Sequence, residues 1–300
     1  MRRTPRKFRG ALCRPALASA VLALAAFGCD PAGPGAEFDT APIDPPAAGV
    51  EPSPDTDDLA EAFAAALSIR NRDRPHRLID PFAADIRARE PLRRAVARLA
   101  VTGPNSTPSF YATPEARLAY WLNARAAWAL MLALDADLPE RMPPAALDRR
   151  RFRLDGEWTT LERIDAEVRT FGWRAVVAAP GVRLQRAGLP DTPFAAEDVQ
   201  ERIRTRLDAY IADDRRVIVR PIERELAFPP VLWQFRDEII ADYERRYGAA
   251  GATFITALLP HTTRRAHLRL QGMLGYTAVG LDRSGTLGLA QWPYWEEQPQ

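Results

Sequence analysis

Histidine and cysteine, the side chains that most often carry acid–base, nucleophilic and metal chemistry, are scarce in this chain of 300 residues. The three histidines are His76, His261 and His267, and the two cysteines are Cys13 and Cys29. In the segment PHTTRRAH the two histidines are six residues apart, whereas a metal site on one helix face uses a spacing of four. The spacing therefore predicts solvated or capping histidines, and no metal site is expected.

The sequence contains no motif for a serine nucleophile or for phosphate binding, and it leaves carboxylate chemistry open. Ser106 and Ser109 lie in a polar loop that lacks the G-x-S-x-G sequence of a nucleophile elbow, and no glycine-rich phosphate loop is present. Paired carboxylates for glycoside cleavage stay open, because Asp and Glu number 39 and their pairing in space is invisible in the sequence. No cofactor is predicted.

The first 28 residues have the layout of a secretory signal peptide. Met1–Arg14 carries six positive charges and no acid, and Ala16–Phe27 is an apolar run too short for an ordinary membrane span of about 20 residues. The sequence Ala26-Phe27-Gly28-Cys29 resembles the bacterial lipobox, in which cleavage precedes the cysteine and its thiol carries diacylglycerol. We therefore expect Cys29 to carry a lipid anchor; a signal peptide cut elsewhere and an uncleaved anchor are the alternatives.

The predicted lipid anchor implies a location in the cell envelope, and it implies that the mature chain has no free thiol. A lipidated Cys29 places the chain in the bacterial cell envelope, on the periplasmic face of the inner or outer membrane, where two or more acyl chains hold it stably. Cys13 leaves with the signal peptide, so the mature chain is expected to have no cysteine nucleophile, disulfide or thiolate metal site.

The charge balance argues against nucleic acid as a partner. Six of the 41 basic residues lie in the signal peptide, which leaves 35 basic residues against 39 acidic ones, a net charge of about −4. Nucleic-acid binding needs a concentrated basic footprint instead.

Residues 29–56 are predicted to form a tether behind the lipidated cysteine. The segment Asp30–Asp58 holds seven prolines, several acids and few large apolar residues, so it cannot bury a core and should be extended and solvated. A folded domain is then expected over residues 57–300, held away from the bilayer.

The longest apolar-periodic run outside the N-terminus is Thr113–Ala136, and it predicts the central helix of the domain. Thr113 can cap this helix, and Pro114 suits the first helical position, where a missing N–H costs nothing. Leu130–Leu134 is apolar nearly all round, so this end of the helix should be covered on several sides.

Shorter periodic segments predict the other elements. Helices are expected within 57–70, 79–100, 161–168, 197–214 and 230–247, with two short ones between 253 and 273. Asp155-Gly156 predicts a hairpin within Arg151–Thr159, and further strands are expected at 217–219, 276–279 and 286–291, the last two closing around a turn at 282–285. The segment 174–179 is buried but of undetermined type. Together these elements predict a mostly helical single α+β domain with a small antiparallel sheet.

The run Ala119-Tyr120-Trp121-Leu122-Asn123, followed by an alanine-rich helix, resembles the hallmark of the bacterial domain-of-unknown-function family number 547. The pattern of that family is an aromatic residue, then Trp-x-Asn, then x-Tyr-Asn-Ala. The resemblance extends more loosely over most of the body, through about 161–169, 172–179, 207–219 and 231–239. It implies a fold distantly similar to papain-like cysteine hydrolases.

The chain departs from the family at the positions that would carry chemistry. Arg125-Ala126 stands where the family has Tyr-Asn, and Ile164-Asp165-Ala166 stands for Ile-Glu-His, with Arg169 kept. Gly172 to Val176, with Arg174, replaces Asp-Pro-Arg-x-His, and Pro180-Gly181 replaces Asn-Cys. The cysteine nucleophile and histidine base that the family would use are therefore missing, and the resemblance implies a degenerate member, a pseudoenzyme without catalytic residues.

The segments that carry the resemblance supply the candidate cleft residues, which are Trp121, Asn123, Arg125, Arg169 and Arg174. Asn123 has two interpretations, a structural hydrogen bond to a neighbouring loop or a place in the wall of a ligand cleft.

The aromatic residues Trp292, Tyr294 and Trp295 close the chain. They would suit sugar stacking or a partner groove. The alternative is that the tail docks onto the body.

These observations predict a membrane-anchored envelope lipoprotein whose body is a non-catalytic binding or scaffolding module for an envelope protein or glycan. The alternatives are an envelope hydrolase that acts on a peptide, ester or glycan with a rewired active site, and an assembly factor that holds a partner through the terminal aromatics. An open cleft at Asn123 with a serine or acid oriented by His261 or His267 would favour the hydrolase. A cleft without such a pair would favour binding.

Overall fold

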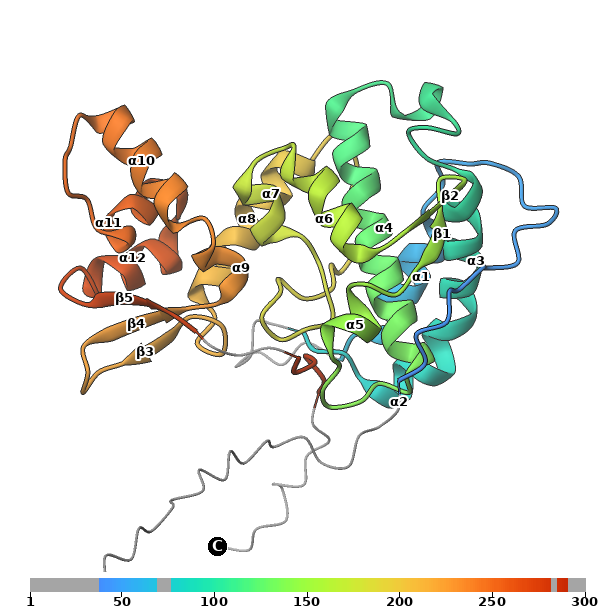
Figure 1. The fold of residues 1–300 in the computed structure, drawn as a ribbon, viewed down its shortest axis with the longest axis horizontal. Coiled ribbons are helices and arrows are strands. Elements are labelled where there is room, and N and C mark those ends of the chain that lie inside the picture. The colour runs from blue at the N-terminus through green and yellow to red at the C-terminus, as the bar shows by residue number, and fades with distance from the viewer. Residues whose placement is uncertain (1–37, 69–76, 282–284, 291–300) are drawn as a thin grey trace, which may run out of the picture. The chain divides into compact units, whose positions relative to one another are not determined.

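The computed structural model describes residues 38–68, 77–281 and 285–290 (Figure 1). Helix α4 (Pro114–Asp135) begins where the sequence predicts. The Thr113 hydroxyl oxygen accepts a hydrogen bond from the Ala116 backbone N–H at 3.1 Å, and Pro114 occupies the first helical position. The predicted central helix is confirmed, because both local signals act as the capping rules require.

Helix α4 is also covered on several sides, as its apolar composition predicts. Every residue from Leu118 to Leu134 except Trp121 is buried. The neighbours that contact it are α3 (Arg89–Val101), α5 (Pro144–Leu147), α6 (Leu161–Arg169) and α8 (Val199–Ala212). Among the described residues, no helix combines the length and the apolar composition that crossing a membrane requires.

The N-terminal helices pack closely through alanines. The chain runs through α1 (Asp57–Ala66), α2 (Pro81–Ala83), the π-helical turn η1 (Ala84–Ala88) and α3. Ala62, Ala66, Ala84 and Ala88 are fully buried, and α1 contacts both η1 and α3. Small side chains allow the helix backbones to approach each other, so this packing follows from the alanine-rich sequence.

The hairpin predicted around Asp155-Gly156 is confirmed. Strands β1 (Phe152–Leu154) and β2 (Glu157–Thr159) pair antiparallel, and Asp155 and Gly156 have φ angles of 53° and 80°. Positive φ at both central residues defines a type I′ turn, whose twist matches that of paired strands. The Phe152 ring stacks on Trp128 of α4 with 4.1 Å between ring centroids, so the hairpin docks on the central helix.

The middle of the chain supplies further helices around α4. The segment of undetermined type at 174–179 forms α7 (Trp173–Ala178), which contacts α6 and α8. Helix α8 realises the predicted amphipathic helix at 197–214. Between α7 and α8 the chain forms neither helix nor strand.

The C-terminal elements combine short helices with a three-stranded sheet (Figure 1). They are β3 (Ile218–Arg220), β4 (Glu225–Phe228), α9 (Pro230–Trp233), α10 (Arg236–Tyr247), α11 (Phe254–Leu258), η3 (Leu259–His261), α12 (Arg264–Gly272) and β5 (Thr277–Gly280). The helix predicted at 230–247 is thus two helices. Mostly helical elements with two small sheets make the chain α+β, as predicted.

The predicted small antiparallel sheet is present as β1 and β2, and the three-stranded sheet is mixed. Strand β3 pairs antiparallel with β4, but β4 pairs parallel with β5. Strand β4 has no counterpart among the predicted strands, and the predicted strand at 286–291 does not pair with β5. Thr286, Leu287 and Leu289 instead form single bridges to Arg141, Arg183 and Ile79. A parallel pair requires a crossover connection of a dozen or more residues, which the helices between β4 and β5 provide.

Residues 38–56 correct the predicted boundary between tether and domain. The Ile43 N–H donates to the Arg151 carbonyl at 2.9 Å and the Arg153 N–H donates to the Ile43 carbonyl, beside β1. Further along, the Ser53 N–H donates to the Thr102 hydroxyl at 3.2 Å. The compact unit therefore begins at Phe38 and not at residue 57. We call residues 38–56 the strap. Prolines are tolerated in the strap because its contacts need few backbone N–H donors. The rest of the predicted tether lies outside the described residues.

Candidate functional site

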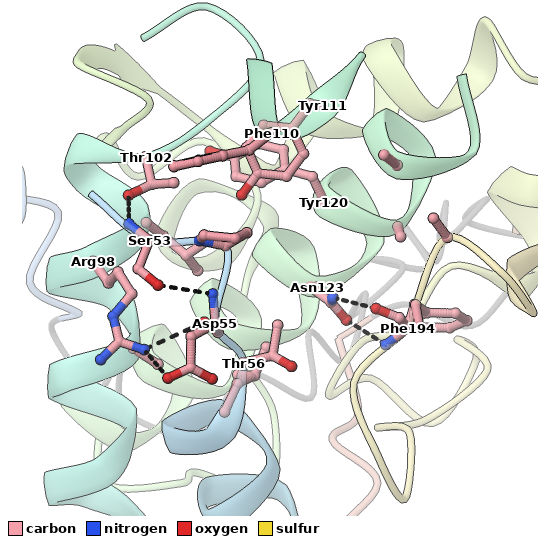
Figure 2. A pocket seen from close by; sticks show the side chains of 18 of the residues that line it. Ser53, Asp55, Thr56, Arg98, Thr102, Phe110, Tyr111, Tyr120, Asn123 and Phe194 are labelled. Atoms are coloured by element: carbon pink, nitrogen blue, oxygen red, sulfur yellow. Dashed lines mark hydrogen bonds and ion pairs between the residues drawn. The ribbon is translucent and has the colours of Figure 1, made fainter. Parts of the chain in front are cut away.

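A pocket of about 270 Å³ lies against the first half of α4 (Figure 2), and we call it the α4 pocket. Ala116, Ala119, Tyr120 and Asn123 line it from α4, and their spacing of three and four residues places them on one helix face. The other walls come from α3 and its C-cap Thr102, from the 3-10 turn η2 (Pro108–Tyr111), from residues between Ser53 and Leu59, and from 194–197.

Aromatic rings and neutral hydroxyls form one side of the α4 pocket. The rings of Tyr111 and Tyr120 lie edge to face with 4.9 Å between centroids, and Phe110 is 43% exposed. Burial and then the charge of Asp155 raise the pKa of Tyr111 to about 12, and the same causes hold the pKa of Tyr120 well above its ordinary value. Both phenols are therefore neutral donors at physiological pH.

The hydroxyl of Tyr120 is buried and has no hydrogen-bond partner among the described residues. A buried unpaired hydroxyl costs about 1–3 kcal/mol, and such groups are rare in native structures. Fold stability alone gives no reason to keep a tyrosine here, because phenylalanine would pack the same ring.

Asn123 of α4 is hydrogen-bonded to the loop at Phe194, which forms another wall of the pocket. Its amide nitrogen donates to the Phe194 carbonyl at 2.9 Å, and its amide oxygen accepts from the Phe194 N–H at 2.7 Å. Asn123 is buried and lines the α4 pocket. Both interpretations of this residue therefore hold in part: it faces the pocket, but its polar atoms hold the loop at Phe194 (Figure 2).

Two of the three acids that line the pocket, Asp55 and Asp58, are paired with arginine, and the third is Glu197. Arg98 donates to the carboxylates of Asp55 at 3.3 Å and Asp58 at 2.9 Å, and Arg94 donates to Asp58 at 2.8 Å. The Ser53 hydroxyl accepts from the Asp55 N–H. No histidine lies among the described residues that line the pocket. Within this described wall, no serine or threonine therefore has a histidine beside it.

Arg125 lies in the interior and not in a cleft. Its guanidinium is 2% exposed and donates through Nε to Asp165 of α6 at 2.5 Å and through Nη1 to the Pro180 carbonyl. Arg186 donates to the same carboxylate at 2.6 Å. Burial would raise the pKa of Asp165, but the charges and hydrogen bonds of the two arginines outweigh it and hold this pKa below its ordinary value.

Arg169 and Trp121 do not line the α4 pocket. The Arg169 guanidinium is exposed, lies 4.7 Å from the centroid of the Phe235 ring, and is 3.6 Å from the Glu238 carboxylate. Trp121 is half-buried and packs its ring against Tyr120 at 5.0 Å.

Arg174 belongs to a separate surface hollow with His261. Arg174 Nη2 lies 2.6 Å from His261 Nδ1, and the rings of Trp173 and His261 meet edge to face at 5.1 Å. Burial, and then the charges of Arg174 and Arg246, lower the pKa of His261 to about 4. The imidazole is therefore neutral at pH 7, and it accepts from an arginine where a catalytic histidine would bond to a carboxylate.

The remaining candidates from the sequence are His267, Cys29, His76 and the aromatic tail. His267 Nδ1 lies 3.2 Å from the Leu259 carbonyl, so it bonds to backbone. Cys29, His76 and the aromatic tail at 292–295 lie outside the described residues. Within the described ranges, no group of three or more His, Cys, Asp or Glu is placed to hold a metal ion.

The five predicted cleft residues are thus dispersed, and only Asn123 lines the α4 pocket. The pocket residues that sequence reasoning missed are chiefly Phe110, Tyr111, Thr102 and Arg98. One signal was present: the stripe Ala116, Ala119, Tyr120, Asn123 sets two polar groups beside two small residues on one helix face. The other walls come from distant segments whose approach no local pattern reveals.

We expect Arg125→Met to lower the free energy of unfolding by about 2 kcal/mol, because the buried Pro180 carbonyl loses its donor and Asp165 keeps only Arg186 as a partner. Urea unfolding measures this loss. The control is Arg149→Met, whose partner is Glu162 in a pair 68% and 54% exposed; exposed pairs contribute little, so no measurable change is expected there. Equal unfolding midpoints for the two variants would contradict the role given to Arg125.

We expect Asn123→Ala to cost about 2 kcal/mol of stability, because the Phe194 N–H and carbonyl are left without partners. Asn123→Asp keeps the acceptor, but its charged form cannot donate to the Phe194 carbonyl. Burial raises the pKa of such a carboxyl, so this variant should regain stability relative to wild type as the pH falls and the carboxyl becomes a donor. Chemical unfolding at several pH values tests this. A pH-independent difference between Asn123→Asp and wild type would refute it.

His261 should make stability depend on pH. Its pKa is about 4 when folded and about 6.5 in an unfolded chain, so the unfolded state binds more protons between these values. Stability is then complete above pH 6.5 and falls as the pH drops through this window. His261→Gln removes the contribution, so between pH 7.5 and pH 5 the wild type should lose more stability than the variant. Parallel losses in thermal unfolding would show that His261 does not titrate this way.

No family model, no curated protein and no solved structure matches this chain. The resemblance to family number 547, with the distantly papain-like fold that it implies, therefore stays a prediction. The geometry of the α4 pocket carries the functional proposal.

Proposed function

We propose that this protein is a lipid-anchored protein of the bacterial cell envelope whose folded body binds a ligand in the α4 pocket without changing it chemically. The signal-peptide layout and the cysteine at its end support the location. One observation carries the binding role: a pocket of about 270 Å³ with aromatic and neutral hydroxyl walls, whose acids Asp55 and Asp58 are paired with arginine.

The size and charge of the pocket favour a small uncharged ligand. Its volume lies just below the range of about 300–1,000 Å³ typical of drug-sized ligand sites, which suits a single ring or one unit of a longer chain. The described lining of the pocket holds one arginine, Arg98, and the three acids Asp55, Asp58 and Glu197, so an anionic ligand would be repelled.

A sugar ring combines the required features. Its apolar face can pack on the exposed Phe110 ring, and its hydroxyls can accept from the neutral Tyr111 phenol and exchange hydrogen bonds with Thr102 and Ser53. Of the two partner classes predicted from the sequence, an envelope glycan therefore fits the α4 pocket better than an envelope protein.

The hydrolase alternative receives no support from the residues that would have to carry it. The family resemblance would place a cysteine at position 181, yet a Cβ added to Gly181 would lie 2.7 Å from Arg125 Nη1. A side chain there requires the buried guanidinium to move. Through Nδ1, His261 bonds to Arg174, which is a cation and not the serine or acid that a hydrolase would need there.

Isothermal titration of the full-length protein in mild detergent with N-acetylglucosamine and its short β-1,4-linked oligomers tests the proposal. We expect saturable binding. Tyr111→Phe should weaken it by a factor of about 5, the equivalent of one hydrogen bond of about 1 kcal/mol, and Phe110→Ala should weaken it by about tenfold or more through the lost ring contact. Phe82→Ala is the matched control, because Phe82 is 65% exposed on α2 and does not line the pocket.

Three results would overturn this function. Equal affinities for Phe110→Ala and Phe82→Ala would place any binding elsewhere, and no binding at millimolar sugar would exclude this ligand class. Cleavage of the oligomers during incubation, followed by chromatography, would favour the hydrolase.

A further inference from the structure

A second pocket, of about 360 Å³, lies beside α8 and is lined by four arginines; we call it the arginine pocket. Arg202 and Arg206 reach it from α8, together with Ala209 one turn further along the same helix face. Arg77 and Arg216 reach it from outside the helix, and Asp191 is the one acid among its described lining residues. Asp191 pairs with Arg77 at 3.4 Å, and Asp213, which does not line the pocket, pairs with Arg216. Four guanidiniums against two carboxylates still leave an excess of positive charge.

Arg206 is the least compensated of these charges. Its Nε donates to the Ala178 carbonyl at 3.0 Å, and its Nη2 donates to the Ala187 and Gly188 carbonyls at 3.1 and 2.8 Å. All three acceptors are neutral. Burial, and then the charges of Arg216 and Arg202, lower the pKa of Arg206 to about 9. The pocket therefore holds a cation at a cost that a bound anion would offset.

The other arginines are also held in place by backbone. Arg202 donates to the Thr192 carbonyl at 2.5 Å, and Arg216 donates to the Arg186 carbonyl at 2.7 Å. These bonds leave Arg206 Nη1 and Arg216 Nη2 without an acceptor in the described part of the chain, and neither atom is enclosed. Fixed guanidiniums with unused N–H groups are pre-organised for an oxyanion.

We propose that the arginine pocket is a binding site for a phosphate group, either free or as a phosphate monoester. A dianion matches the excess positive charge, and its tetrahedral oxygens can accept from several guanidiniums at once. The site is independent of the α4 pocket, because none of its arginines lines that pocket, and the negative wall of the α4 pocket selects against the same ligand.

The test is titration of the full-length protein with inorganic phosphate at pH 7.5 and constant ionic strength, by calorimetry and by thermal unfolding. We expect one saturable site and a rise in the melting temperature that chloride does not produce. Glycerol 3-phosphate in a parallel titration identifies the source: tighter binding than phosphate points to a monoester, and weaker binding points to the free ion. Both results support the site. Equal binding of acetate would overturn the choice of a dianion.

The obvious variant, Arg206→Gln, removes three backbone contacts and can unfold the protein. Ala209→Glu avoids this problem, because it keeps every arginine and adds a carboxylate to the pocket wall. We expect it to weaken phosphate binding by at least about tenfold, since like charges in one site cost several kcal/mol. Gln200→Glu makes the same change of charge on an exposed part of α8 outside this pocket and should leave the affinity nearly unchanged. Unaltered phosphate binding by Ala209→Glu, or no binding by the wild type, would overturn the proposal.

Discussion

The structure depends on how the backbone between α7 and α8 satisfies its polar groups. This stretch of about twenty residues forms neither helix nor strand, yet much of it is buried, and a buried carbonyl without a donor costs free energy comparable to a lost hydrogen bond. Side chains from α4, from α8 and from Arg216 shortly after α8 supply the donors. The bonds run from Arg125 to Pro180, from Tyr210 to Gln185, from Arg216 to Arg186, from Arg206 to Ala187 and Gly188, from Arg202 to Thr192 and Pro193, and from Asn123 to Phe194.

Arginine suits this task for a physical reason. A guanidinium offers five N–H donors in a rigid plane, so Arg206 can hold three carbonyls at once, whereas a lysine presents three donors around a single point charge. Lys7 is the only lysine in the chain. Compositional bias alone could explain its scarcity, but the contacts give the arginines of α4 and α8 a structural role. The buried guanidiniums of Arg125 and Arg186 share the single carboxylate of Asp165.

The two pockets lie at different parts of this same loop and differ in charge. Phe194 and its neighbours form a wall of the α4 pocket, where Asp55 and Asp58 neutralise Arg98. Ala187 to Thr192 border the arginine pocket, where positive charge is in excess. Among the described residues, His261 bonds to Arg174, His267 lies against the Leu259 carbonyl, and Asp55 and Asp58 pair with Arg98. These contacts are the reason that we propose recognition.

Local interactions were readable from the sequence, and long-range ones were not. The cap at Thr113, the apolar stripe of α4, the type I′ turn at Asp155-Gly156 and the amphipathic pattern of α8 each involve residues a few positions apart, so composition and spacing predict them. Strand β4 escaped prediction because its parallel pairing with β5 depends on a crossover of about fifty residues. The strap at 38–56 reads as a solvated tether because its contacts lie on distant segments.

The same contrast between local and long-range interactions applies to the candidate site. The sequence alone places Tyr120 and Asn123 on one face of a helix and shows that no cysteine follows Cys29 and that only three histidines are present. It does not decide that Asn123 binds Phe194, 71 residues away, or that Arg125 meets Asp165, 40 residues away. Only the tertiary structure brings these groups together, because a hydrogen bond or an ion pair depends on distance in space and leaves no periodic trace along the chain.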